Sequence, residues 1–300
     1  MSREQPAQQA PPVQRLRLRY AKRGRLRFAS HRDFSRAFER ALMRARIPMA
    51  YSSGFNPHPR ISYAGAAPTG AASEAEYAEI GLREVSDPGQ VLALLDEALP
   101  PGLDVLEVVE SAGGALADRL EASHWLITLP EVSVESAALA VAEFLAADEV
   151  LVERMTKRGL REFDARAAVV RLEVPSGGAA VAGGASGGRV ARRRREMGVG
   201  PSTDDNVARR GRGVAQQETA DQQELFVTED TERPTTCAIL DLVLRHGTPA
   251  VRPDDILVGL HHRGGLPSST AALIQRLAQG PLDSETGTVG DPLAPDRDAK

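Results

Sequence analysis

The sequence predicts an α+β protein built from two ferredoxin-like (split βαβ) units in tandem. Segments whose apolar residues alternate with polar ones, typical of strands, are interleaved with segments whose apolar residues recur every three to four positions, typical of helices. The order strand, helix, strand, strand, helix, strand is completed between residues 13 and 112 and starts again near residue 122. The chain of 300 residues is long enough for two such units.

The first unit, residues 13–112, opens on a half-buried strand. In VQRLRLRYAK the side chains of Arg15, Arg17 and Arg19 fall on one face and apolar side chains on the other. RGRLRFAS follows as a glycine turn and a second short extended piece. Further strands are expected around residues 61–66, at 75–82 and at 103–110, with a second helix that begins near residue 87.

The first helix is expected over residues 31–46. Ser30 is a suitable N-cap, Asp33 places a carboxylate in the first turn, and Pro48 ends the helix. Arginines at every fourth position form a ridge opposite an apolar stripe. The members of this arginine ridge are Arg32, Arg36, Arg40 and Arg44.

The second unit is expected to comprise residues 122–174 and 234–265. It contains a strand at SHWLITLP, a helix over 133–147, and two strands, EVLVERMT and REFDARAAVVRLEV, joined by a KRG turn. TTCAILDLVLRHGTP resumes the apolar pattern, and RPDDILVGLHHRG follows as helix or turn. Residues 175–233 are rich in Gly, Ala, Ser and charge and lack periodicity, so we expect a disordered insert. Residues 1–12 and 279–300 are expected to be disordered as well.

The composition excludes several classes of protein. The single cysteine, Cys237, excludes a disulfide within the chain and an iron–sulfur cluster held by this chain alone. We therefore expect no cofactor in this chain. The sequence has no apolar run of the length of a membrane span, and MSREQPAQQAPP has no apolar core of a secretory signal. We expect a cytoplasmic protein.

The net charge of −4 hides a strong asymmetry. Residues 13–60 hold thirteen Lys or Arg and two acidic residues. Local charge of this kind predicts binding to phosphate-rich material such as RNA. Two alternatives to RNA binding stay open. In the first, the basic face contacts only solvent, and in the second it binds an acidic surface of a protein partner.

The segment AYSSGFNPHPRISYAGAAPTG, residues 50–70, concentrates aromatic residues in a chain where they are scarce. Its Gly and Pro residues restrict the path of a loop, which would place Tyr51 and Phe55 near the arginine ridge as a binding loop. The alternative is a packed corner with Phe55 in the core. The residues expected to bind nucleic acid are Arg32, Arg36, Arg40, Arg44, Tyr51, Phe55, Arg60, Lys157 and Arg166.

A catalytic alternative rests on His31, Asp33 and His58. Two histidines could act as general acid and base on a ribose 2′-hydroxyl, which would make the chain a metal-independent RNA-cleaving enzyme. With Asp33 they could also ligate a metal. Helix capping already explains Asp33, and catalysis needs both imidazoles within about one water of a shared point.

The segment FASHRDFSRAFERALMRARIPMAYSSGFNPHPRISYAGAAPTGAASEAEYAEI resembles the opening of the radical-SAM-linked protein family, a bacterial domain of unknown function. RMTKRGLREFDAR resembles the second motif of that family through Lys157, Gly159, Asp164 and Arg166. The resemblance covers roughly residues 14–175 and 233–262, and the insert and tail depart from it. The residues of the first motif are Ser30, His31, Asp33, Arg36, Arg40, Tyr51, Ser52, Gly54, Phe55, Pro57 and Pro59.

The resemblance implies with which kinds of protein this chain functions. Members are often fused behind a cobalamin-binding radical-SAM protein, or are encoded beside one and beside a ribonuclease of the E/G type and ribosomal protein genes. Because this chain lacks the cysteines of a cluster, it would be the free-standing partner. We therefore expect an accessory RNA-binding protein that partners a radical-SAM enzyme or the RNA and ribosome maturation machinery. A purely protein-binding docking subunit of the radical-SAM enzyme is the further alternative.

Overall fold

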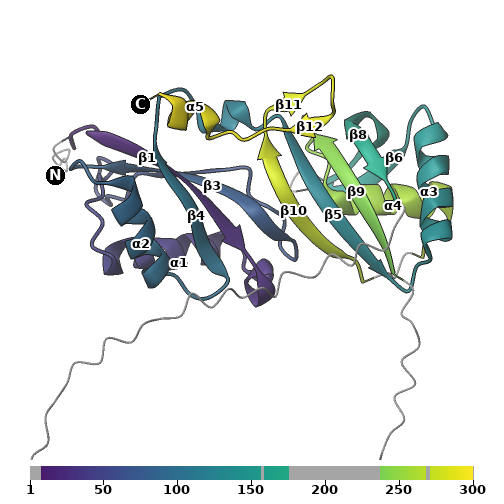
Figure 1. Cartoon of the computed structure of the whole chain (residues 1–300), viewed down its shortest axis with the longest axis horizontal. Coiled ribbons are helices and arrows are strands. Elements are labelled where there is room, and N and C mark those ends of the chain that lie inside the picture. Colours follow the sequence, from purple (N-terminus) through teal and green to yellow (C-terminus); the bar gives the residue numbers. More distant parts are fainter. Residues whose placement is uncertain (1–7, 157–158, 176–236, 268–270, 300) are drawn as a thin grey trace, which may run out of the picture. The chain divides into compact units, whose positions relative to one another are not determined.

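The computed structural model describes residues 8–156, 159–175, 237–267 and 271–299. The α+β class predicted from the sequence is confirmed (Figure 1). Within the described ranges the strands form one eight-stranded, mainly antiparallel sheet in the order β4-β1-β3-β10-β5-β9-β8, with β2 also paired to β3. None of the described helices is both long and apolar enough to cross a membrane.

The first half of the sheet has the strand order β4-β1-β3-β2, with every neighbouring pair antiparallel. This is the order of a split βαβ unit. Residues of β1 that face α1 are buried, and Tyr20 stacks on Phe34 of the helix at 4.6 Å between ring centroids. The elements are β1 (Gln14–Lys22), the 3₁₀ helix η1 (Gly24–Phe28), α1 (His31–Arg44), β2 (Ile61–Ala64), β3 (Ala72–Leu82), α2 (Pro88–Ala98) and β4 (Leu103–Glu110).

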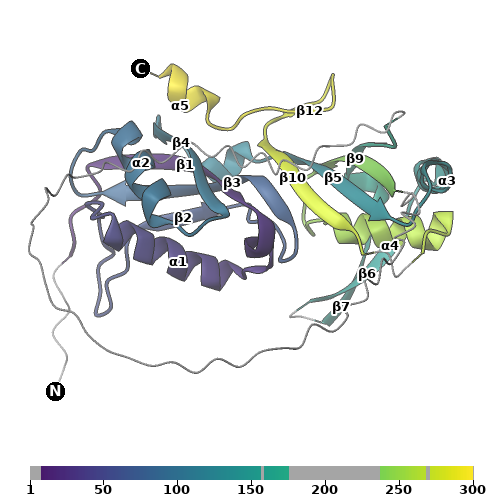
Figure 2. The same ribbon diagram turned by 60° about the horizontal axis from the view of Figure 1, so that its bottom comes forward.

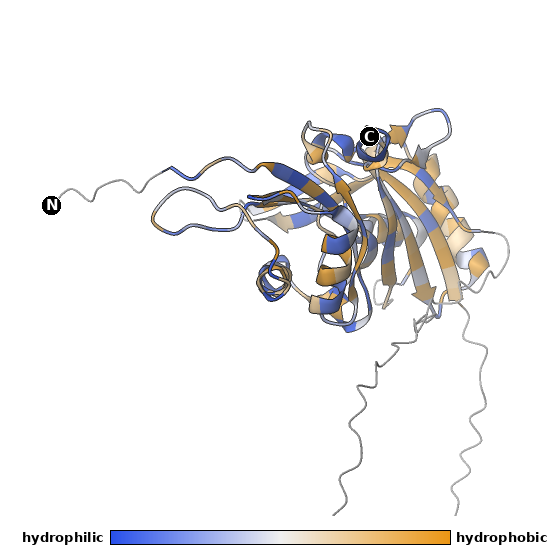
Figure 3. Ribbon diagram, turned by 60° about the vertical axis from the view of Figure 1, so that its left-hand side comes forward, coloured by the Kyte–Doolittle hydropathy of each residue, from blue (hydrophilic) through white to orange (hydrophobic). Residues whose placement is uncertain are grey.

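The second half repeats this order as β10-β5-β9-β8, again antiparallel throughout. Its helices pack closely, because a Cβ atom at Gly264 of α4 would lie 2.4 Å from Cβ of Ala140 in α3. In Figure 3 the strands show hydrophobic residues interleaved with hydrophilic ones, as half-buried strands do. The elements are β5 (Ala122–Pro130), α3 (Val134–Ala146), β8 (Val169–Glu173), β9 (Cys237–Arg245), α4 (Pro253–Gly264) and β10 (Leu273–Gly280).

A separate hairpin of β6 (Leu151–Thr156) and β7 (Gly159–Asp164) interrupts the second half between α3 and β8. The sequence predicted one continuous strand where β7 and β8 occur. The Asp164 carboxylate causes the break, because it accepts hydrogen bonds from the backbone N–H groups of Val150, Arg166 and Ala167. These bonds stabilise a 3₁₀ turn, η3 (Arg166–Ala168), instead of an extended chain.

The C-terminal region differs from its prediction. The expected second unit ended at residue 265, yet its fourth strand, β10, begins at Leu273. Residues 279–299 were expected to be disordered, but they form the end of β10, the hairpin of β11 (Leu282–Asp283) and β12 (Thr288–Val289), and α5 (Ala294–Asp298). Burial of Leu293 and Asp296 accounts for this order. Residues 1–7 and 176–233 of the segments predicted to be disordered lie outside the described residues.

The two halves join where β3 runs parallel to β10 (Figure 2). Only two residue pairs form this ladder, Gln275 with Ala72 and Arg276 with Ser73. Arg276 is buried, and its guanidinium contacts the Glu76 carboxylate at 2.5 Å and the Gly65 carbonyl at 2.7 Å. A buried ion pair therefore reinforces a short backbone contact.

His246 connects β9 to the segment before β5. Its Nδ1 lies 2.8 Å from the carbonyl oxygen of Leu120, and its Nε2 lies 3.1 Å from Oγ of Ser123. A neutral ring satisfies both contacts by donating from Nδ1 and accepting at Nε2. Burial lowers the pKa of His246, the bond to Leu120 opposes that effect, and Arg276 adds to it.

We expect the contribution of His246 to stability to be lost in mild acid. Because folding lowers its pKa, the unfolded chain binds the proton more readily, so the contribution is present above the unfolded pKa of about 6.5 and declines below it. Urea unfolding at about pH 7.5 and about pH 5.5 should show a smaller pH effect for His246→Gln than for the wild type. Equal effects in the two proteins would contradict this assignment.

Candidate nucleic-acid interface

Helix α1 begins with the cap predicted from the sequence. Oγ of Ser30 accepts from the backbone N–H of Asp33 at 3.2 Å and donates to the Asp33 carboxylate at 2.6 Å. The hydrogen bond from Ser30, with Arg36 and Arg32 nearby, holds the pKa of Asp33 below its usual value. Asp33 is therefore explained by its role in capping the helix.

Three members of the arginine ridge point to solvent. Arg32, Arg36 and Arg40 are exposed on α1, opposite the face that packs Phe34 and Phe38 into the core. Within the described part of the chain, none of the three forms a hydrogen bond or ion pair through its side chain. Their guanidinium groups are free to bind phosphate, which they match in geometry.

Arg44, the fourth predicted member, does not belong to this face. Its Nη1 donates to the carbonyl of Ala98, the last residue of α2, at 3.1 Å. Successive residues of a helix turn by about 100°, so a spacing of four drifts by about 40° each time, and Arg44 is rotated by about 120° from Arg32. This rotation brings Arg44 to α2, where it satisfies a terminal carbonyl group.

The loop that follows α1 exposes both aromatic residues expected to bind. Tyr51 is 39% exposed and Phe55 is 61% exposed, so Phe55 is not a core residue. Arg60 contributes to the loop itself, because its Nε donates to the carbonyl of Tyr51 at 3.1 Å. His58 closes the loop by donating its backbone N–H to Oγ of Ser52 at 3.0 Å.

The structure does not bring His31 and His58 together. His31 opens α1 and its ring meets Tyr63 edge-on at 4.9 Å, whereas His58 belongs to the loop that follows α1, and Figure 2 shows this loop at the opposite end of the helix. A helix of 14 residues is about 20 Å long at the usual rise per residue. Across the described residues there is no group of three or more His, Cys, Asp or Glu side chains that could hold a metal ion.

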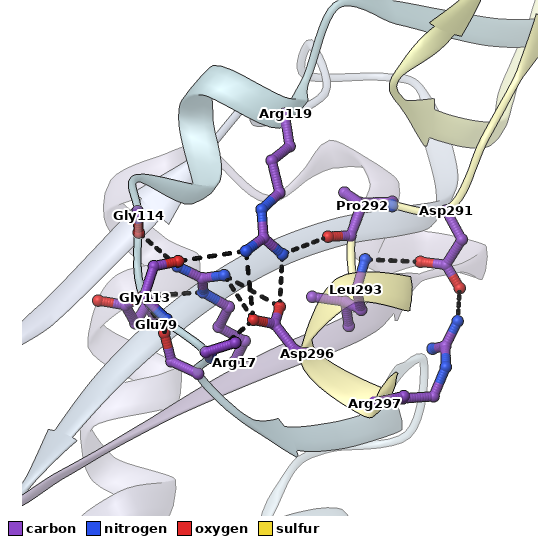
Figure 4. Close-up of polar contacts among 12 residues, drawn as sticks. Arg17, Glu79, Gly113, Gly114, Arg119, Asp291, Pro292, Leu293, Asp296 and Arg297 are labelled. Carbon is purple, nitrogen blue, oxygen red and sulfur yellow. Dashed lines mark hydrogen bonds and ion pairs between the residues drawn. The ribbon is translucent and has the colours of Figure 1, made fainter. Parts of the chain in front are cut away.

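The arginines of β1, which the alternation of the sequence places on one face of the strand, contact groups within the protein. Arg15 pairs with Glu79 at 3.1 Å, and Nε of Arg19 donates to the carbonyl of Glu74 at 2.9 Å. Arg17 is fully buried, and its guanidinium contacts Glu79 at 2.9 Å and Asp296 at 2.8 Å (Figure 4). The C-terminal segment brings Asp296 to this face, which therefore does not offer a free basic surface.

Two arginines of the second half also contact groups within the protein. Nε of Arg166 lies 3.4 Å from the carbonyl of Leu145, a contact within its own half. Arg154 of β6 pairs with Asp255 of α4 at 2.5 Å. Lys157 lies outside the described residues. Among the described residues that were expected to bind nucleic acid, the exposed ones therefore lie on α1 and in the loop after it.

A comparison with protein families identifies the chain. The family described as "uncharacterized protein conserved in bacteria (DUF2344)" matches residues 15–201, more than half of the 300 residues. The chain belongs to this family. The DUF2344 match opens in β1 and includes α1, the loop after it and the β6–β7 hairpin, and thus all the residues expected to bind. No curated protein matches the chain.

Two further residues near the start of α1, Arg27 and Phe28, were not among those expected to bind in this DUF2344 member. The segment RGRLRFAS was expected to be extended, but residues 24–28 form η1 and leave Phe28 59% exposed. The Arg27 guanidinium lies over the Phe28 ring, 4.6 Å from its centroid. The signal in the sequence that could have indicated these two residues is an arginine followed by an aromatic residue, two positions before the cap at Ser30.

Proposed function

We propose that the chain is an accessory RNA-binding protein that grips RNA phosphates with Arg32, Arg36 and Arg40. The observation that carries the proposal is the contrast between two sets of arginines. Those of β1 contact protein groups, whereas Arg32, Arg36 and Arg40 of α1 are exposed and form no side-chain hydrogen bond or ion pair among the described residues. Exposed guanidinium groups along one helix supply the electrostatic part of RNA binding.

The nearby aromatic residues support the choice of RNA over other anions. Tyr51 and Phe55 are exposed in the loop after α1, and single-stranded bases stack on such rings. The face of the first half that carries Arg17 is covered by the segment with Asp296. RNA would therefore bind at the helical side of this half rather than on the strands.

The resemblance to the radical-SAM-linked family supports a partner for this activity. We propose that the chain presents RNA to a cobalamin-binding radical-SAM enzyme or to the RNA and ribosome maturation machinery. A docking subunit without RNA affinity would use the same exposed arginines against an acidic protein surface. The salt dependence of RNA binding separates these two functions.

Reversing the charge of the ridge should abolish RNA binding. We expect the variant with Arg32, Arg36 and Arg40 all changed to Glu to lose most of its affinity for total cellular RNA, because three phosphate contacts are removed. The slope of log affinity against log salt should fall in magnitude by about 2 to 3. Binding is measured across a salt series, and sequencing the bound RNA would then name the target.

A matched control variant changes the same number of arginines to Glu at other positions of the chain. Arg161 of the β6–β7 hairpin, Arg245 at the end of β9 and Arg263 of α4 are exposed, and changing all three to Glu alters the net charge equally. This control should bind RNA nearly as well as the wild type. Loss of binding in both variants would indicate a nonspecific charge effect. Absence of binding by the wild type would favour the docking subunit.

A further inference from the structure

A pocket of about 310 Å³ lies beside η1, just before the start of α1. Its size is at the lower end of the range found for small-molecule sites and suits a single nucleotide unit. A larger hollow of about 570 Å³ continues from it along α4 and shares Asp254, Ala272 and Ile274 with it. The walls of the smaller pocket are Arg27, Phe28, residues 68–71, Pro253, Asp254 and residues 271–274.

The pocket has an aromatic wall suited to a flat ligand. Phe28 is 59% exposed, although it is a large apolar side chain, and the Arg27 guanidinium stacks on its ring. Nucleobases stack on aromatic rings and on guanidinium planes alike. Leu273 is 48% exposed and adds an apolar surface to the same pocket.

The polar groups of the pocket are also free. Asp254 and Thr69 are exposed, and neither side chain has a hydrogen-bond partner among the described residues. A carboxylate accepts hydrogen bonds and cannot donate them. It therefore suits a base edge that carries adjacent N–H donors, and guanine presents two of these, N1–H and N2–H, on one edge.

The surroundings of the pocket carry the charge that a nucleotide needs. Arg27 lines the pocket, and Arg32 of the ridge lies five residues further along the chain, in the first turn of α1. Phosphates of one strand could contact the ridge while a base leaves the strand and enters the pocket. Apolar walls with a few convergent polar groups are typical of ligand sites.

We propose that this pocket receives a guanine base of a single-stranded RNA, stacked on Phe28 and bound through its N–H edge to Asp254. The proposal rests on the proposed function and deepens it by naming what the protein reads in the RNA. The ridge supplies affinity that is independent of the sequence, and the pocket supplies a preference for one base.

The experiment distinguishes binding to the base from binding to the sugar–phosphate backbone. The probes are two labelled abasic ribose–phosphate strands of about eight units, one of which carries a single guanine at its centre. Both present the same phosphates. The full-length wild type should bind the strand with guanine about tenfold more tightly, as one stacked base allows. Phe28→Ala should bind both strands equally, and Asp254→Asn should reduce the difference in affinity between the two strands.

The control is Leu139→Ala, which truncates a 69% exposed side chain on α3 that does not line the pocket. It should keep the tenfold difference. Salt-dependent binding of both strands with equal affinity by the wild type would overturn the pocket and leave the proposed function standing. A guanine preference that survives in Phe28→Ala would also overturn it. If the wild type binds neither strand nor cellular RNA, the proposed function fails as well.

Discussion

Replacing Arg17 with methionine should lower the free energy of unfolding by about 3–5 kcal/mol, the usual cost of removing one partner of a buried ion pair. The guanidinium of Arg17 donates to Asp296 at 2.8 and 2.9 Å and to the carbonyls of Gly113 and Gly114 at 3.0 and 2.5 Å (Figure 4). Methionine fills much of the volume but makes none of these bonds. Asp296, whose side chain is fully buried, would keep only part of its charge compensation.

The variant should also loosen the C-terminal segment. Besides Arg17, Asp296 contacts Arg119 at 2.7 Å and accepts from the backbone N–H of Ala112 at 2.9 Å. These three partners attach α5 to the first half. We expect limited proteolysis to cleave the C-terminal segment faster in Arg17→Met, and urea unfolding to report the loss of stability.

Arg15→Met is the matched control, because it removes an arginine of the same strand. The Arg15 side chain is 59% exposed, and its pair with Glu79 should contribute less than about 1 kcal/mol. If Arg17→Met costs no more than Arg15→Met, the buried network does not stabilise the chain in the way proposed here.

The dependence of stability on acidic pH should report on the same network around Asp296. Burial acts to raise the pKa of Asp296, but hydrogen bonds from Ala112, Arg17 and Arg119 outweigh it and hold the pKa below its usual value. A carboxyl group of this kind adds stability above its unfolded pKa of about 3.9, and the contribution is lost as the pH falls through the lower folded value. The stability of Arg17→Met should therefore decline less steeply in this range than that of the wild type.

Replacing Arg276 with methionine should cost a similar amount, about 3–5 kcal/mol, and should weaken the joint between the two halves of the sheet. Arg276 contacts Glu76 at 2.5 Å and Gln279 at 2.6 Å, and its guanidinium lies 5.3 Å from the centroid of the Trp125 ring. Without it the Glu76 side chain, 3% exposed, keeps the weak contacts of its carboxylate with the Ala67 N–H at 3.3 Å and the attraction of the nearby Lys22.

The readout is the cooperativity of unfolding. Trp125 is the only tryptophan of the chain and lies in β5 beside the joint, so its fluorescence reports on this region. Far-ultraviolet circular dichroism reports on all elements. In the wild type we expect coincident urea transitions from the two probes, and in Arg276→Met we expect transitions that separate.

A double variant tests the electrostatic origin of the effect. Glu76→Gln combined with Arg276→Met removes both charges and should cost less than the sum of the two single changes. Additive losses would show that packing, rather than the ion pair, accounts for the stability of the joint. Arg171→Met, which breaks a pair with Asp241 that is 29% and 22% exposed, should leave the transitions coincident.

Local periodicity was sufficient for most elements of the first half. The cap at Ser30, the apolar stripe of α1 and the alternation of β1 depend on neighbours within a few residues, and the structure shows each of them. The exposure of Arg32, Arg36 and Arg40 follows from the same 3.6-residue period. The length of the second half was harder to predict because its strands β8 and β9 are separated by a long stretch without periodicity.

Local sequence patterns are sufficient to predict that the chain is α+β, that α1 is amphipathic and that its basic side is rich in arginine. Which arginines are free depends on contacts between residues that are distant in the sequence. Arg17 and Arg32 are the same residue type, but the partner of Arg17 is Asp296, 279 positions away, and no periodic pattern encodes such a pair. Likewise α5 has five residues, too few to form a stable helix alone, and becomes ordered only because the first half buries Leu293 and Asp296.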